Sequence, residues 1–523
     1  MGKEQFQRLS QSPTRPVSKT KSGGFDVAEL YEGPLKHTDR SIHNELPLDE
    51  KLRKAYFWIV NEGIISPFYD IAFNTKPPQR HQFGDSRVSL DLPSDQSYSS
   101  YVLLPLLNLA VRRRCLLVGG PGRGKTVIAT ILGVLSGYHI DEVRRGIQHG
   151  QPQMTIADLL GNPLPSSLVS AQSMDEVVIA WRKWLGMRIK IIDEYNRIPT
   201  RTQSALLTVM SDNYAELYDQ IFECPPSAWY LTANDDAGGG TYQVIEALRD
   251  RIDVVVKALH FNSRFIRKLL QRVEAGISPE DIVPDEIIFS EAELNSISKS
   301  IQAVPIPDGL QRRLEFFVAQ FEFFEPGAKS LDYMTKDTVK VAGVPLSSFS
   351  ADGKDLTLDI GSQTENGVSV RALMTIIVFV KAMAYFRGHS EVSFEDIRQI
   401  IPFVLHDKLV QNPDAPFFDQ SGHDAFRSDH VNWIRTLFDL SCTEYERLNR
   451  DSQDPVLEEL ELFDKGLDGL SANEVHKRMV RIEKILRQWQ KQKLQGQMLD
   501  DLLTLKYLHQ RYTNYWNWLQ CQS

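Results

Sequence analysis

The stretch Gly119-Gly120-Pro121-Gly122-Arg123-Gly124-Lys125-Thr126 matches the pattern G-x-x-x-x-G-K-[ST], and it lies between an apolar run, 115–118, and a helix-like segment, 127–135. Glycines let backbone amides touch phosphate oxygens without a Cβ in the way. In such a loop the lysine neutralises the β- and γ-phosphates, and the hydroxyl residue contributes to Mg²⁺ binding. We therefore expect these eight residues to bind ATP, with Thr126 also a ligand of Mg²⁺.

A second apolar run, 189–192, ends in two carboxylates, Asp193 and Glu194. Asp193 is predicted to hold Mg²⁺, and Glu194 to orient the water that attacks the γ-phosphate. Such a pair is by itself more often a solvated strand end. The alternating α/β pattern that follows the phosphate loop favours the catalytic interpretation. Lys190 interrupts the run, although a central parallel strand is normally apolar throughout, so it either extends its charge to solvent or marks a less buried strand.

The next apolar run, 229–233, ends at Asn234, whose amide could position the attacking water. An asparagine after a strand is otherwise simply a turn former. Two arginines, Arg249 and Arg251, then precede a further apolar run. If the protein forms a ring, one of them can reach the γ-phosphate of a neighbouring copy, which is worth roughly 10³ to 10⁵ in rate. We favour Arg251 over Arg249; the simpler alternative is a surface ion pair with Asp250.

From residue 101 onward, short β-like runs alternate with helical stretches. This rhythm predicts an α/β fold in which helices cover a parallel sheet. The expected division is a disordered tail at 1–24, an N-terminal extension at 25–98, a nucleotide-binding core at 99–262, a helical lid at 263–410 and a C-terminal helical region at 411–523. A hairpin at about 326–367, with strands at 338–344 and 355–360, is expected within the lid.

Both ends of the chain carry helical patterns outside the expected core. A helix should begin after Pro47, followed by an irregular connection at 77–96. Near the other end, apolar residues recur at helical spacing over 475–489 and 499–519. Such stripes mostly indicate helices that pack against each other, and a docking face for another protein is the alternative.

The composition limits the partners and the location of the protein. Its 523 residues include 59 basic and 68 acidic side chains, a net charge of −9 that makes nucleic acid an unlikely partner. A local basic pore at Arg144, Arg145 and His149 would keep that alternative open. Four widely spaced cysteines give no disulfide framework, which favours a reducing cytoplasm. The most apolar stretches are shorter than the ~20 residues of a spanning helix, so no membrane partner is expected.

Several further runs resemble the MoxR family of AAA+ ATPases, a family of the helix-2-insert clade. They are Asp193-Glu194-Tyr195-Asn196-Arg197-Ile198-Pro199, Thr202-Gln203-Ser204-Ala205-Leu206-Leu207, the pair Asp250-Arg251, Gly367-Val368-Ser369-Val370-Arg371-Ala372, and Val404-Leu405-His406-Asp407-Lys408-Leu409. Together with the phosphate loop they cover about residues 99–410. Two departures are Tyr195, where an aliphatic residue is usual, and the large insertion expected in the lid.

The resemblance implies the AAA+ fold, a P-loop parallel sheet with a helical lid, assembled as a ring that is expected to be a hexamer. It implies that Arg371 reports the γ-phosphate. It also implies an inserted hairpin that includes Ile147, Gln148 and 158–161, and a second hairpin around 214–224, both lining the central surface of the ring. A separate protein with a von Willebrand A domain is an expected partner.

These inferences predict a chaperone-like ATPase that remodels a protein client, activates it, or inserts a cofactor or metal into it. Two alternatives remain. A motor that acts on nucleic acid would be stimulated by DNA or RNA. A nucleotide-switched scaffold would show little turnover.

Overall fold

The computed structural model describes residues 47–65, 68–84, 88–170, 176–234, 246–258, 261–343, 346, 360–448, 454–492, 494 and 496–522. The expected tail at 1–24, the first part of the N-terminal extension and most of the second strand expected in the lid lie outside these residues.

A five-stranded parallel sheet forms the centre of the molecule, in the order β13-β5-β12-β9-β6. Its strands are β5 (Arg114–Val118), β6 (Gln148–His149), β9 (Ile189–Asp193), β12 (Ala228–Ala233) and β13 (Val254–Lys257). The α/β prediction is confirmed, and four strands fall on the apolar runs. Because all strands point the same way, the residues that follow β5, β9 and β12 meet at one border of the sheet, here called the carboxyl edge. The opposite border is the amino edge.

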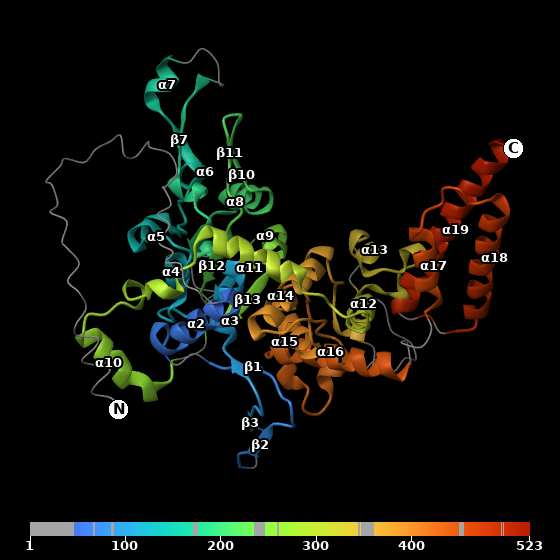
Figure 1. Cartoon of the computed structure of the whole chain (residues 1–523), viewed down its shortest axis with the longest axis horizontal. Coiled ribbons are helices and arrows are strands. Elements are labelled where there is room, and N and C mark those ends of the chain that lie inside the picture. The colour runs from blue at the N-terminus through green and yellow to red at the C-terminus, as the bar shows by residue number, and fades with distance from the viewer. Residues whose placement is uncertain are drawn as a thin grey trace.

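Helices cover both faces of this sheet (Figure 1). The helices of the core are α3 (Ser100–Val111), α4 (Lys125–Leu135), α5 (Ile140–Gly146), α8 (Thr200–Asp212) and α9 (Glu246–Arg251). α3 is almost wholly buried and carries Pro105 in its interior. The carbonyl of Pro105 accepts a hydrogen bond from the Tyr230 hydroxyl at 2.8 Å, which joins α3 to β12.

Two hairpins project from the same side of the core (Figure 1). The first joins β7 (Gly161–Pro163) to β8 (Ile179–Trp181), with α6 (Ile156–Leu160) at its base and α7 (Pro165–Ser170) inserted. The second joins β10 (Tyr214–Leu217) to β11 (Gln220–Glu223), as expected. The rings of Trp181 and Phe222 join the two hairpins, with centroids 5.6 Å apart. The expectation that Gln148 belongs to the first hairpin is wrong, because it pairs with Ile192 as part of the central sheet.

The N-terminal extension packs onto the core and the lid. It consists of α2 (Leu48–Trp58), a π-helical turn (Ile59–Gly63), the pair β1 (Ile71–Ala72) and β4 (Ser97–Tyr98), and an exposed ribbon of β2 (Gln79–Gln82) and β3 (Ser89–Leu92). The ribbon lies where the sequence predicted an irregular connection. Tyr56 of α2 is fully buried, and its ring contacts Phe386 of the lid.

The lid and the C-terminal region are helical. Their helices are α10 (Ile266–Glu274), α11 (Glu291–Ala303), α12 (Asp308–Glu322), α13 (Lys336–Val341), α14 (Val370–Arg387), α15 (Phe394–Leu405), α16 (His430–Arg447), α17 (Pro455–Asp464), α18 (Ala472–Trp489) and α19 (Gly496–Gln522). α16 packs on α12 and α15, so it joins the lid, whereas α17 to α19 enclose a small core of their own. None of the helices in the described residues is both long and apolar enough to cross a bilayer.

The strand expected at 338–344 is wrong, because these residues begin within α13. The Thr335 side chain accepts a hydrogen bond from the Thr338 amide and caps the helix. The buried Lys336 then donates to the carbonyls of Gly361 and Thr364, which fixes the helix against the following segment. Local alternation predicted a strand, but the cap and the buried lysine favour a helix.

Lys190 is neither exposed nor on a peripheral strand, since it is 1% exposed in the centre of β9. Its ammonium donates hydrogen bonds to the carbonyls of Leu185 at 3.0 Å and Met187 at 2.7 Å, and to Ser227 Oγ at 2.8 Å. Burial lowers the pKa of Lys190 to about 8. The cation thus joins β9 to the residues that precede β9 and β12.

We expect Lys190→Met to change how stability depends on pH. The unfolded chain binds a proton at Lys190 more tightly than the folded chain, so the folded wild type should gain stability as pH rises from 8 towards 10.5. The gain relative to Lys190→Met should reach at most about 3 kcal/mol. Urea unfolding across this pH range measures it. Lys477→Met, at an exposed position of α18, is the control, and parallel pH curves for wild type and Lys190→Met would contradict the assignment.

Candidate active site

The loop at 119–124 leaves β5 at the carboxyl edge and turns into α4. Gly122 and Gly124 have φ of 70° and 77°, in the left-handed region that favours glycine. At Gly119 a Cβ would lie 2.7 Å from the carbonyl oxygen of Ala258, so only glycine fits there. The first amides of α4 have no carbonyl partner within the helix, which makes this helix start a suitable site for an anion.

Lys125 is the first residue of α4 and is only 7% exposed. Its ammonium donates to the carbonyls of Gly119 and Gly120 and, at 2.9 Å, to Asn234 Oδ1. A cation held inside a ring of backbone groups, at the start of a helix, fits the phosphates of ATP.

Asp193 lies beside the hydroxyl predicted to bind Mg²⁺. Its Oδ1 accepts hydrogen bonds from Thr126 Oγ1 at 2.9 Å and Thr232 Oγ1 at 2.6 Å, and its Oδ2 is 3.3 Å from His149 Nδ1. Carboxylate and hydroxyl oxygens are the ligands that Mg²⁺ prefers, so the group fits that ion. Sequence reasoning missed Thr232. It could have been found, because residues two apart on a strand share a face and Thr232 precedes Asn234 by two.

Glu194 has a φ of 53°, which is uncommon for a residue with a side chain. Its amide donates to Thr232 Oγ1 at 2.9 Å. Its Oε1 accepts from Asn234 Nδ2 at 2.8 Å, and its Oε2 is 3.2 Å from Arg197 Nε. Asn234 therefore bridges Lys125, which is expected at the phosphates, and Glu194, which is expected at the water. Tyr195 is buried and fills the place of the usual aliphatic residue.

The predicted arginines do not join this group. Arg251 donates to Ser211 Oγ and to the Ala247 carbonyl, and Arg249 is exposed on the same helix, α9. Arg371, at the start of α14, forms an ion pair with Asp250. One turn later, Thr375 Oγ1 donates to Asp253 Oδ1 at 2.6 Å.

Asp253 marks the amino edge of the sheet. Its Oδ2 accepts from the amide of Arg114, the first residue of β5, at 2.9 Å. Arg371 and Arg251 therefore lie by the amino edge, whereas Lys125, Asp193, Glu194 and Asn234 lie at the carboxyl edge. The length of the sheet thus separates Arg371 from the phosphate loop of its own chain, and the role of Arg371 in reporting the γ-phosphate stays a prediction.

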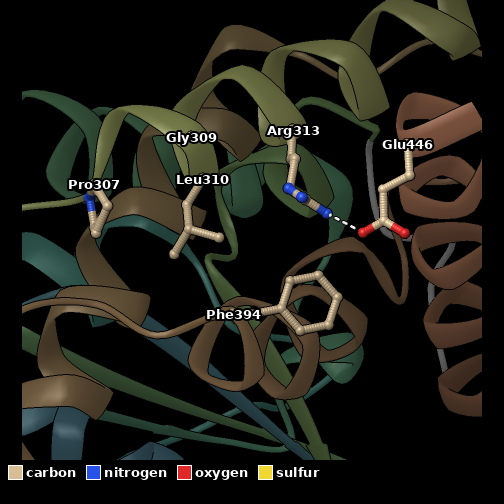
Figure 2. A pocket seen from close by; sticks show the side chains of 6 residues that line it. All are labelled: Pro307, Gly309, Leu310, Arg313, Phe394 and Glu446. Atoms are coloured by element: carbon tan, nitrogen blue, oxygen red, sulfur yellow. Dashed lines mark hydrogen bonds and ion pairs between the residues drawn. The ribbon is translucent and has the colours of Figure 1, made fainter. Parts of the chain in front are cut away.

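A cavity of about 410 Å³ lies in the lid, away from these residues. It is lined by Pro307, Gly309, Leu310, Arg313, Phe394 and Glu446. Figure 2 shows Arg313 and Glu446 forming an ion pair at 2.7 Å on one side of the space, with apolar side chains on the other. None of the residues that line the cavity belongs to the group at the carboxyl edge.

Comparison with known proteins matches two parts of the chain to protein families. Residues 114–254 match the ATPase family associated with various cellular activities (AAA), and residues 358–426 match the AAA lid domain. Chaperone MoxR1 of Mycobacterium tuberculosis is 25% identical over 226 residues, which are 43% of this chain and 51% of MoxR1. The chain thus spans about half the length of that relative.

Two further matches extend over more of the chain. The uncharacterized protein YeaC of Bacillus subtilis is 24% identical over 317 residues, which are 60% of this chain and 83% of YeaC. A crystal structure from Cytophaga hutchinsonii, described as an ATPase, is 19% identical and covers 64% of this chain and 89% of its own, with a TM-score of 0.44.

We expect Thr232→Val to lower Mg²⁺-dependent ATP turnover about 10- to 100-fold, as is usual when a residue that orients a metal ligand is removed. The valine keeps the shape of the strand but no longer binds Asp193 or the Glu194 amide. Turnover measured against Mg²⁺ concentration tests this expectation. Thr443→Val removes an exposed hydroxyl on α16 and is the control. Equal Mg²⁺ dependence in both variants would show that Thr232 has no role at the metal.

Proposed function

The chain belongs to the MoxR type of AAA+ ATPases, and on that premise we propose that it hydrolyses ATP at the seams of a ring, with six copies expected, to remodel a protein client. The work on the client would be its activation, or the insertion of a cofactor or metal. The proposed location is the cytoplasm, in keeping with the buried free thiols of Cys115, Cys224 and Cys442.

One observation carries this proposal. The residues that suit ATP and Mg²⁺ gather at the carboxyl edge, while Arg251 and the Arg371–Asp250 ion pair lie by the amino edge. A single copy cannot bring the two sets together. A neighbouring copy that presents its amino edge to this carboxyl edge would do so, and repetition of that contact closes a ring.

The roles of the residues follow from their positions. Mg²⁺-ATP, when bound, supplies the phosphoanhydride bond whose cleavage releases free energy. Lys125 and the loop amides offset the charge of the phosphates, and Thr126 and Asp193 would hold the metal. Glu194 orients the water, and Asn234 couples its carboxylate to Lys125. The neighbour's arginines add positive charge where negative charge develops.

The two hairpins of the core are the proposed contacts with the client. Val169 at α7 is 90% exposed, and Ile221 and Tyr218 of the second hairpin are 64% and 45% exposed. Exposed apolar side chains on projecting elements suit a protein partner. A basic pore for nucleic acid has less support, because Arg144 lies 3.5 Å from both Glu280 and Asp281, and His149 contacts Asp193. A separate von Willebrand A domain partner stays a prediction.

We expect Glu194→Gln to bind ATP and to stay assembled, but to lose turnover by about 10² to 10⁴. Glutamine keeps the hydrogen bond from Asn234 but cannot take up a proton from water. Phosphate release and sedimentation in saturating ATP test the two parts of this expectation, with Glu461→Gln on α17 as the control. The stalled variant should also retain clients for identification. Hydrolysis at the wild-type rate would refute the role of Glu194.

Mixing two inactive variants tests whether the site is shared. Lys125→Ala cannot bind phosphate but keeps its arginines. Arg251→Ala keeps its phosphate-binding residues but lacks the arginine proposed to reach the neighbour's site. Each should lose at least about 10³ in turnover, and an equimolar mixture should regain a measurable fraction, since some seams then join two intact halves. Arg249→Ala in place of Arg251→Ala shows which arginine crosses the seam. A mixture no more active than its parts would contradict a shared site.

A further inference from the structure

α10 is an amphipathic helix whose polar side faces the protein. Lys268 Nζ donates to the Asn61 carbonyl, and Arg272 donates to the Gly63 carbonyl at 3.0 Å and to the Glu62 carbonyl. Within the described part of the chain, no residue of α10 is buried. A surface helix normally buries its apolar stripe and exposes its charges, so the usual orientation is reversed here.

The apolar side of α10, together with Phe265 just before the helix, faces solvent. Its members are Phe265, Ile266, Leu269, Leu270 and Val273, which are 43%, 54%, 41%, 52% and 70% exposed. Contiguous apolar surface of this kind marks an interaction site. We call these five residues the α10 face.

The polar side of α10 lies near the phosphate loop, so the α10 face is the outer side of a helix at this edge. Arg272 donates a hydrogen bond to the carbonyl of Gly63. The residue after Gly63, Ile64, packs near the phosphate loop, because its Cδ1 lies 3.9 Å from where a Cβ on Gly124 would be. α10 also follows β13 in the sequence, and Ala258, the residue after β13, donates its amide to the Val118 carbonyl at the carboxyl edge. Figure 1 shows α10 at one end of the molecule, far from the C-terminal helices.

A second exposed apolar pair flanks the arginine at the other edge. Val370 is 74% exposed and Met374 is 52% exposed, one turn apart on α14. Arg371, which pairs with Asp250, lies between them in the sequence. Each edge of the molecule therefore combines part of the proposed ATPase site with uncovered apolar side chains.

We propose that the α10 face binds a neighbouring copy of the chain. In this contact, the α10 face of one copy packs against Val370 and Met374 of the other copy. This inference rests on the proposed function and names the surface that forms the seam. The two patches differ, so the contact is head to tail and can close into a ring. A bilayer suits the face less well, because Lys268 and Arg272 bind carbonyl groups on the side away from it, whereas membrane-surface helices direct their cations to lipid headgroups.

Two single variants break opposite halves of this contact. Leu270→Glu places a charge on the α10 face, and Val370→Glu places one on the pair, at the first position of α14, where an acidic residue favours a helix. Each variant should sediment as a single copy in saturating ATP and lose at least about 10² in turnover, because the neighbour's arginines are absent. Val480→Glu, at a 48% exposed position on α18, should assemble normally. Unchanged thermal unfolding shows that all three are folded.

An equimolar mixture of the two variants gives the decisive result. The intact α10 face of the Val370→Glu copy should bind the intact Val370–Met374 pair of the Leu270→Glu copy. Dimers therefore form, and no third copy can be added because the remaining surfaces carry the introduced glutamates. ATP is then hydrolysed only in the Val370→Glu copy. Adding Glu194→Gln to that copy should abolish the restored turnover, whereas adding it to the Leu270→Glu copy should leave it unchanged.

Assembly of Leu270→Glu at wild-type size and activity would overturn the inference while leaving the proposed function in place. The same holds if Leu270→Glu abolishes binding to phosphatidylserine vesicles but assembles normally, since the face would then belong to a membrane. A wild type that neither assembles nor hydrolyses ATP would instead refute the proposed function, and with it the seam.

Discussion

The length of the central strands separates the two halves of the chemistry. β5 contains five residues, so about 16 Å of strand lies between Arg114 at the amino edge and the phosphate loop at the carboxyl edge. No arginine side chain spans that distance from α9 or from the start of α14. The ion pair of Arg371 with Asp250 keeps this cation at the far edge. Within one chain the group at the carboxyl edge therefore includes Lys125 but neither Arg251 nor Arg371, and this separation is the basis of our proposal that two copies share the site.

At the carboxyl edge, a few strand-end residues hold the reacting groups in register. Thr232 and Asn234 project from one face of β12 and its end, towards Asp193 and Glu194. Lys190 strengthens this arrangement from within β9. Its ammonium forms hydrogen bonds with Leu185, in the segment before β9, and with Ser227, in the segment before β12. A buried cation with three acceptors resists a slip between the strands, since any slip would leave a charge without partners. Lys190 thus supports β9 and β12, the strands that carry the site, although it touches none of the site's members.

The sequence predicted what depends on local patterns. The phosphate loop, the four apolar strands and the placing of Asn234 beside Glu194 follow from spacing and from the parallel sheet. The family resemblance placed Gln148 in a hairpin, and β6, an edge strand of two residues, has no periodicity from which the strand could have been predicted. α13 was assigned to a strand, because the contacts of Lys336 come from residues more than twenty positions away. The position of Arg371 depends on how the lid meets the amino edge, and no local pattern encodes that.

In the proposed ring, the lid would connect Arg371 mechanically to the C-terminal helices. Arg371 lies in the first turn of α14, and α14 packs on α15, α15 on α16, and α16 on α12. α12 in turn packs against α19. The two helices approach so closely at Gly496 that a Cβ there would lie 2.5 Å from the Ala319 carbonyl oxygen. The ion pair of Lys506 with Asp332 adds a second link between α19 and the lid. Close-packed helices move together rather than deform. In the proposed ring, any shift of Arg371 towards a neighbour's phosphates would therefore carry the lid and the C-terminal helices with it, so that hydrolysis would move parts of the molecule that touch neither edge of the sheet.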